Sequence, residues 1–236
     1  FAAVAPLQPV AWSDGGLVCA PRAAPDLAGP ALRRCPLPVR PVGEVPGWPA
    51  PPSDTVAGWY RRGPDHLPAP AGVREILQVD GPAFGAAGHE TTALALAAID
   101  MLEPGPAVDA GCGSGTLALA WATLGRGPVE AVDLDPDAVR QTADAARLTG
   151  LDGRLRVRRD ALERVRVGDR VLLANLPPAA HLALRAAVTE PPRAAVLTGV
   201  RRGAGRDVAD HYLRLGMRVR SVARLGRWER WLLVRP

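Results

Sequence analysis

The segment 106–116, Pro-Ala-Val-Asp-Ala-Gly-Cys-Gly-Ser-Gly-Thr, constrains the fold most strongly, because an apolar strand in it runs directly into three closely spaced glycines. Gly111, Gly113 and Gly115 can take positive φ and let the backbone approach a ligand closely. The helix that should follow offers unpaired N–H groups at its N-terminus. This strand–loop–helix order is typical of open α/β sheets that bind a nucleotide-containing cofactor.

Two details of this glycine loop indicate which cofactor it suits. A dinucleotide fingerprint spaces its glycines as G-x-G-x-x-G, whereas Gly115 comes one residue early and Thr116 holds the expected position. Asp109, on the strand, would repel a pyrophosphate but suits a cofactor that carries an ammonium group and a sulfonium. We therefore expect S-adenosylmethionine rather than NAD.

Acidic residues also close the next two strands. Asp133 ends the strand 129–133 and can accept hydrogen bonds from both ribose hydroxyls, while Asp160 follows the strand 154–159, where an adenine amino group needs an acceptor. Ligands of open α/β sheets bind outside the carboxyl ends of the strands, so these residues and Asp109 should converge on one crevice. The alternative for each acid taken alone is a helix N-cap.

Composition limits the partners of the chain. Its 236 residues suffice for one α/β domain and an appendage. Its net charge of +5 is the excess of 29 basic residues, all of them arginine, over 24 acidic residues. Residues 193–236 carry 11 Arg against 3 acids and could form a positive face that contacts RNA. Without clustered aromatic residues beside it, a solvated surface is the simpler interpretation.

Cysteine usage and hydropathy bear on location. Cys19, Cys35 and Cys112 have neither C-x-x-C nor zinc spacing, which favours a reducing cytoplasm and no metal. His89-Glu90 is not a zinc motif, because no second His follows four residues later. The chain has no apolar run of about 18 residues and no signal-peptide pattern, so we expect no membrane segment.

The composition changes along the chain near residue 70. Residues 1–70 hold 15 of the 25 prolines and show no sustained periodicity, so we predict an irregular N-terminal region that faces the substrate or covers the site. Within it, the turn signal Asp14-Gly15-Gly16 predicts a hairpin near residues 9–20.

Residues 71–236 alternate strand and helix patterns, which predicts a doubly wound, mostly parallel α/β sheet. Two β-like runs at the end predict a closing antiparallel hairpin. The expected helices are 91–102, 115–124, 136–149, 179–189 and 205–215, and the expected strands after the glycine loop are 129–133, 154–159, 170–174, 194–198, 217–223 and 227–234.

The loop Asp109-Ala-Gly-Cys-Gly-Ser-Gly, Asp133 and the closing hairpin together resemble the class I S-adenosylmethionine-dependent methyltransferases over residues 71–236. The resemblance implies a Rossmann-like sheet of seven strands with a reversed strand near one edge. The segment from Gly81 to Thr92 is similar to the F-G-T-G-x-H-x-T-T motif of the ribosomal protein L11 methyltransferase family, although Ala86-Ala87 replaces Thr-Gly. That similarity implies that four residues help to form the methionine end of the pocket: Phe84, Gly85, His89 and Thr92.

Ala174-Asn175-Leu176-Pro177-Pro178 lies where amine- and amide-methylating members of this superfamily carry a substrate-clamping motif. It is similar to N-L-P-Y and N-P-P-Y but lacks their aromatic residue. The Asn175 amide oxygen and a carbonyl exposed at Pro177 could accept hydrogen bonds from an amine, and we also expect Asn175 to contact the cofactor. The two prolines also suit the start of a helix, and both interpretations can hold at once. His181 is close in sequence, but we expect it on a helix surface rather than as a general base.

The resemblance implies an N-methyltransferase that acts on amino groups of a protein. Two alternatives remain open at the level of sequence. Residues 1–70 do not look like the compact substrate-presenting domain of the family, so a small molecule could be the acceptor. The altered loop also leaves open a cofactor-binding module that has lost catalysis.

Overall fold

The computed structural model describes residues 7–13, 16–21, 55–63, 74–79, 81, 83 and 89–236. The chain divides into two compact units, Phe1–Glu75 and Ile76–Pro236.

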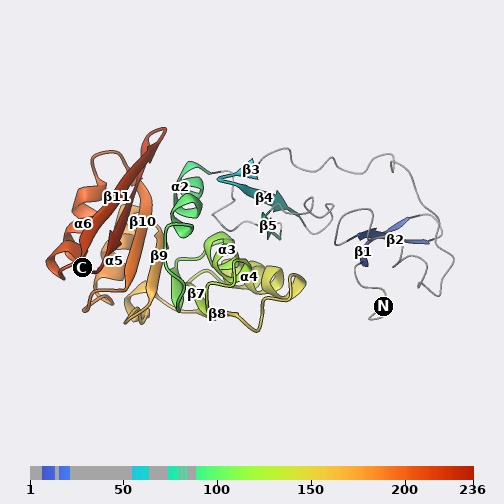
Figure 1. The fold of residues 1–236 in the computed structure, drawn as a ribbon. Helices are drawn as coiled ribbons and strands as arrows, with labels where there is room; N and C mark the ends of the chain where they lie inside the picture. The colour runs from blue at the N-terminus through green and yellow to red at the C-terminus, as the bar shows by residue number, and fades with distance from the viewer. Residues whose placement is uncertain are drawn as a thin grey trace. The chain divides into compact units, whose positions relative to one another are not determined.

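The second unit is built on a seven-stranded sheet in the order β11-β12-β10-β9-β6-β7-β8 (Figure 1). Four neighbouring pairs, from β10-β9 to β7-β8, are parallel, and β12 pairs antiparallel with both β10 and β11. This confirms the doubly wound, mostly parallel sheet and its closing hairpin. The strands are β6 (Ala107–Ala110), β7 (Val129–Asp133), β8 (Leu155–Arg159), β9 (Val171–Asn175), β10 (Ala194–Arg201), β11 (Arg218–Leu225) and β12 (Trp228–Val234).

Helices cover both faces of this sheet (Figure 1). One face carries α2 (Glu90–Ile99), α3 (Thr116–Thr123) and α4 (Pro136–Leu148). The other carries α5 (Pro178–Arg185) and α6 (Gly205–Arg214), with the 3₁₀ turn η1 (Leu162–Arg164) packed beside them.

Period-two alternation decides which side chains reach which face. Leu172 and Ala174 of β9 belong to the core under α5 and α6, so the next residue, Asn175, points to the α2 side. Val108 and Ala110 likewise enter that core, and Asp109 between them points to α3. The sheet therefore directs these two polar side chains to the same layer.

His181 corrects one expectation. We expected it on a helix surface, but only 1% of it is exposed, and its Nε2 lies 2.8 Å from the Thr198 carbonyl oxygen. Burial lowers the pKa of His181 to about 4, so the ring is neutral at neutral pH and donates this hydrogen bond from Nε2.

In the first unit, β1 (Leu7–Ser13) and β2 (Gly16–Pro21) pair antiparallel, which confirms the hairpin predicted near residues 9–20. Three further strands, which the sequence patterns did not reveal, form a small sheet in the order β3-β4-β5: β3 (Thr55–Val56), β4 (Trp59–Arg62) and β5 (Arg74–Leu77). The boundary between the two units falls within β5, after Glu75. Strands of two to four residues are too short to show periodicity. Trp59 is fully buried, and Arg62 Nε lies 2.8 Å from Glu75 Oε1. Among the described residues, no helix has both the length and the hydropathy to cross a membrane.

Candidate functional site

The glycine loop connects β6 to α3, and its three glycines all take positive φ: 71° at Gly111, 54° at Gly113 and 79° at Gly115. A Cβ on Gly111 would lie 2.3 Å from Leu176 Cδ2, and one on Gly115 would lie 2.6 Å from the Thr142 side chain. Conformation and crowding together require glycine at both of these positions.

Asp109 lies beneath this loop rather than on its surface. Only 1% of Asp109 is exposed, and its Oδ2 accepts a hydrogen bond from Ala118 N of α3 at 3.0 Å. Burial raises the pKa of Asp109 to about 7; the Ala118 bond lowers it and the charge of Asp133 raises it further. The structure thus gives this carboxyl a partner in the following helix, and its contact with a cofactor ammonium stays a prediction.

Asp133 meets the glycine loop from the next strand. Its Oδ2 accepts from Gly113 N at 2.9 Å and its Oδ1 from Asp135 N at 3.0 Å. Each carboxylate oxygen retains acceptor capacity beyond one hydrogen bond. Asp133 therefore lies where the sequence predicted an acceptor, at the carboxyl end of β7 beside the loop.

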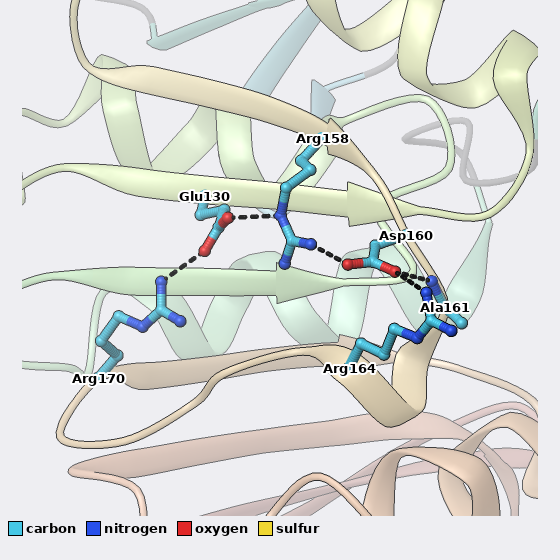
Figure 2. A network of polar contacts seen from close by, with 6 residues as sticks. All are labelled: Glu130, Arg158, Asp160, Ala161, Arg164 and Arg170. Carbon is cyan, nitrogen blue, oxygen red and sulfur yellow. Dashed lines mark hydrogen bonds and ion pairs between the residues drawn. The ribbon is translucent and has the colours of Figure 1, made fainter.

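Asp160 is brought next to Asp133 by the backbone, because Asp160 N donates to the Asp133 carbonyl at 3.0 Å. Its side chain accepts from Ala161 N at 2.9 Å and from Arg158 Nη1 (Figure 2). The Ala161 bond foremost, with the charges of Arg158 and Arg164, lowers the pKa of Asp160. The structure thus brings two of the predicted acids together at the edge of the glycine loop.

Leu134 is a residue that the sequence reasoning missed. It follows Asp133 directly and is 62% exposed, one of the most exposed large apolar side chains among the described residues. Its carbonyl accepts from Arg159 Nε at 3.0 Å, which fixes the backbone there. The available signal was an apolar residue immediately after the strand-ending acid.

Asn175 ends β9 on the α2 side of the sheet. Its Nδ2 donates to Thr92 Oγ1 at 3.3 Å, whereas its Oδ1 is buried and accepts no hydrogen bond from any described residue. The next residue, Leu176, packs over Gly111 of the glycine loop. Asn175 thus presents an unsatisfied buried acceptor beside the loop, and buried acceptors rarely stay unpaired without a reason.

Pro177 was predicted to act together with Asn175, but its carbonyl has different surroundings. Its carbonyl accepts from Ala180 N at 3.0 Å and from His181 N at 3.1 Å, so its two lone pairs serve the first turn of α5. Pro177 is the N-cap of α5, and Pro178 is its first residue. Pro177 therefore starts a helix, and its contact with an acceptor amine stays a prediction.

The segment before α2 is attached to the same site. His89 is the N-cap of α2; its Nδ1 accepts from Thr91 N at 3.3 Å, and its ring centroid lies 5.6 Å from that of Trp228. Gln78, which sequence reasoning missed, donates to Ser114 Oγ at 3.2 Å and to Thr116 Oγ1 at 2.6 Å. Phe84 and Gly85 lie outside the described residues. Within the described part of the chain, no group of three or more His, Cys, Asp or Glu residues could hold a metal ion.

Comparison with known proteins places this site in a family. Among curated proteins, the chain is 37% identical over 110 residues to the ribosomal protein L11 methyltransferase of Geobacter sp. (strain M21), a match covering 43% of this chain and 36% of the relative. It is 46% identical over 112 residues to the enzyme of that name from Alkalilimnicola ehrlichii, covering 45% and 37%. The chain thus spans little more than a third of the length of these relatives.

Solved structures share the fold. The ribosomal protein L11 methylase of Lactobacillus delbrueckii subsp. bulgaricus superimposes with a TM-score of 0.64 at 24% identity, covering 75% of this chain and 95% of that one. A putative RNA methyltransferase of Pyrococcus horikoshii gives 0.52 at 16% identity, covering 61% and 82%. The family model "Ribosomal protein L11 methyltransferase (PrmA)" matches residues 66–235. Because that match takes in most of the sequence, including every site residue described above, the chain belongs to the PrmA family of ribosomal protein L11 methyltransferases.

Proposed function

We propose that this chain is an S-adenosylmethionine-dependent N-methyltransferase that modifies amino groups of a protein, with ribosomal protein L11 as the acceptor suggested by its family. The observation that carries the proposal is the Asn175 carboxamide. Its buried Oδ1 accepts no hydrogen bond from the described residues and lies beside a glycine loop. An amine is the acceptor class that supplies the missing N–H donor.

The residues around the loop fit an adenosyl cofactor. Asp133 offers acceptors for ribose hydroxyls, and Asp160 offers one for an adenine amino group. The exposed Leu134 side chain, next to Asp133 in the chain, offers apolar surface for the adenine ring. When bound, the cofactor supplies a methyl group on a sulfonium. We propose that Phe84, Gly85, His89 and Thr92 hold its methionine end.

Asn175 would orient the acceptor rather than deprotonate it. Thr92 holds its Nδ2, so Oδ1 can receive an N–H of a neutral amine and direct the nitrogen lone pair at the methyl carbon. An ammonium group has no lone pair and must first lose a proton. His181 does not serve as the base, because it is buried and its Nε2 donates to Thr198 O. We propose that water takes the proton.

Three further proposals concern an RNA contact, the location of the protein and the role of residues 1–70. The edge strand β11 exposes Arg218, Arg220 and Arg224, which supports an RNA contact through the C-terminal face. Because the family's acceptor is a ribosomal protein, we propose that the protein works in the cytoplasm. Residues 1–70 are proposed to face the acceptor.

Calorimetric titration with S-adenosylhomocysteine tests the cofactor half of the proposal. The wild type should bind it and should not bind NAD. Asp133→Asn should weaken binding at least about tenfold, because a charge-assisted hydrogen bond is lost. Asp135→Asn is the matched control, since Asp135 caps α4 and Asn caps equally well. NAD binding in place of S-adenosylhomocysteine would refute the cofactor assignment.

The acceptor half needs methyl-labelled S-adenosylmethionine and a bacterial lysate separated into protein, RNA and small molecules. Label in one protein band is the expected result. Label only in small molecules would refute the protein acceptor and favour a small-molecule methyltransferase. Cofactor binding without label in any fraction would favour a non-catalytic module.

A further inference from the structure

Four side chains of alternating charge form a chain of contacts at the β8 edge of the sheet, and Arg164 of η1 contacts the Asp160 carboxylate from the other side, 4.0 Å from Oδ1 (Figure 2). Arg170 Nη1 lies 2.8 Å from Glu130 Oε2, and Arg158 Nε lies 2.9 Å from Glu130 Oε1. Arg158 Nη1 then contacts Asp160 Oδ2. The four side chains are 19–30% exposed, so solvent screens these contacts only in part.

The strand register explains why these residues meet. Arg158 of β8 pairs with Val132 of β7, and Glu130 lies two residues earlier on the same face of β7. Arg170 directly precedes β9. The chain of contacts thus starts beside a central strand and ends at Asp160, next to the proposed adenine position.

Arg158 is held at two points of its rigid guanidinium group. Glu130 binds Nε, and Asp160 binds Nη1, so the planar fork has little rotational freedom left. The second oxygen of Asp160 accepts from Ala161 N at 2.9 Å. The Asp160 carboxylate is therefore fixed from both of its oxygens.

We propose that Arg158 is a positioning residue for base recognition: anchored by Glu130, it holds the Asp160 carboxylate in the orientation that accepts the exocyclic amino group of adenine. The inference rests on the proposed cofactor. It goes beyond it by assigning the discrimination between purine bases to an ion-pair chain on the opposite face of the sheet from α2.

The proposal predicts a property that a purely structural ion pair would not have. Adenine carries an amino donor at C6, whereas hypoxanthine carries a carbonyl acceptor there. A fixed carboxylate accepts from the first and repels the second, and a site built around such an acceptor rejects the wrong partner strongly. A carboxylate free to rotate would discriminate less.

The experiment is a calorimetric comparison of S-adenosylhomocysteine with S-inosylhomocysteine on the whole chain. The wild type should prefer the adenosyl compound at least about thirtyfold. Arg158→Gln should reduce this preference about tenfold, and Glu130→Gln should reduce it less, because Asp160 still contacts Arg158. Arg158→Lys should restore part of it, since it keeps the charge.

Arg156→Gln is the matched control. Arg156 lies two residues earlier on the same face of β8 and has no ion pair to an acid among the described residues. Its side chain lines a surface groove together with Glu130, Arg158 and Asp160. Its substitution should leave the preference unchanged. Because the preference is a ratio measured on the folded fraction, loss of some protein to misfolding does not imitate the effect.

Three outcomes would overturn the inference, each with a different meaning. An Arg158→Gln variant with the wild-type preference would refute the positioning role alone. A wild type that binds both compounds equally would refute the adenine contact of Asp160 as well. A wild type that binds neither compound would refute the proposed cofactor itself.

Discussion

The Nδ2 end of the Asn175 carboxamide binds Thr92, and we propose that its Oδ1 end binds the acceptor. Asn175→Ala removes the orphaned Oδ1, so we expect kcat to fall about 10²-fold or more, as for lost positioning groups. The dissociation constant of S-adenosylhomocysteine should stay within about threefold, because the fold of the loop is kept. Steady-state kinetics and calorimetry measure the two quantities.

Thr92→Val is the graded control for this prediction. It removes the hydroxyl that holds Nδ2 but leaves Oδ1 in place, so the loss in kcat should be smaller than in Asn175→Ala. An Asn175→Ala variant with wild-type kcat would contradict the role of the carboxamide.

From the raised pKa of Asp109 we predict that the stability of the protein depends on pH. Burial raises its pKa from 3.8 to about 7, so the folded state holds more protons than the unfolded state between these values. Its contribution to the free energy of unfolding is therefore fully present below about pH 4 and is lost as pH rises through about 7. His181 has the opposite sign, because its lowered pKa makes stability fall as pH drops from 6.5 towards about 4.

Denaturant unfolding of the wild type and Asp109→Asn across pH 4–7 isolates the first effect, since His181 is common to both proteins. The wild type should lose stability relative to the variant by an amount on the order of a few kcal/mol as pH rises. A difference that stays constant with pH would contradict the raised pKa.

At the scale of elements, the parallel strands and their helices could be predicted because strand patterns that reach Asp109, Asp133 and Asp160 alternate with helix patterns. The hydrogen-bond partners of each acid could not be predicted. Whether a strand-ending carboxyl faces a crevice or a helix depends on which face the sheet turns to α3, and that is a property of packing. The burial of His181 was missed for the same reason, because tertiary contacts decide it, whereas the strands β3 to β5 were missed because they are too short to show periodicity.

The crowding around Gly115 leads to a prediction about the glycine loop. Gly115 and Gly150 both have positive φ, of 79° and 67°, but only Gly115 has a side chain within 4 Å of an added Cβ. Gly150→Ala should cost about 1 kcal/mol from backbone strain alone, and Gly115→Ala should cost at least about 1 kcal/mol more from the clash with Thr142. Equal losses in denaturant unfolding would contradict the crowding at the loop.

At the scale of the molecule, every described site residue lies in the unit Ile76–Pro236. The division into residues 1–70 and 71–236 stays a prediction, and it has a direct test. Residues 71–236 expressed alone should fold and bind S-adenosylhomocysteine within about tenfold of the whole chain, because the sheet and both helical layers are kept. Circular dichroism and calorimetry check this; an unfolded product would contradict the division.

The proposed methylation is tested by intact-mass spectrometry of purified ribosomal protein L11 after incubation with S-adenosylmethionine and either the wild type or Asn175→Ala. We predict that L11 gains mass in steps of one methyl group with the wild type, on amine nitrogens, and far more slowly with the variant. Unmodified L11, under conditions in which the wild type binds S-adenosylmethionine, would contradict the proposed acceptor. Equal methylation by both proteins would contradict the part assigned to Asn175.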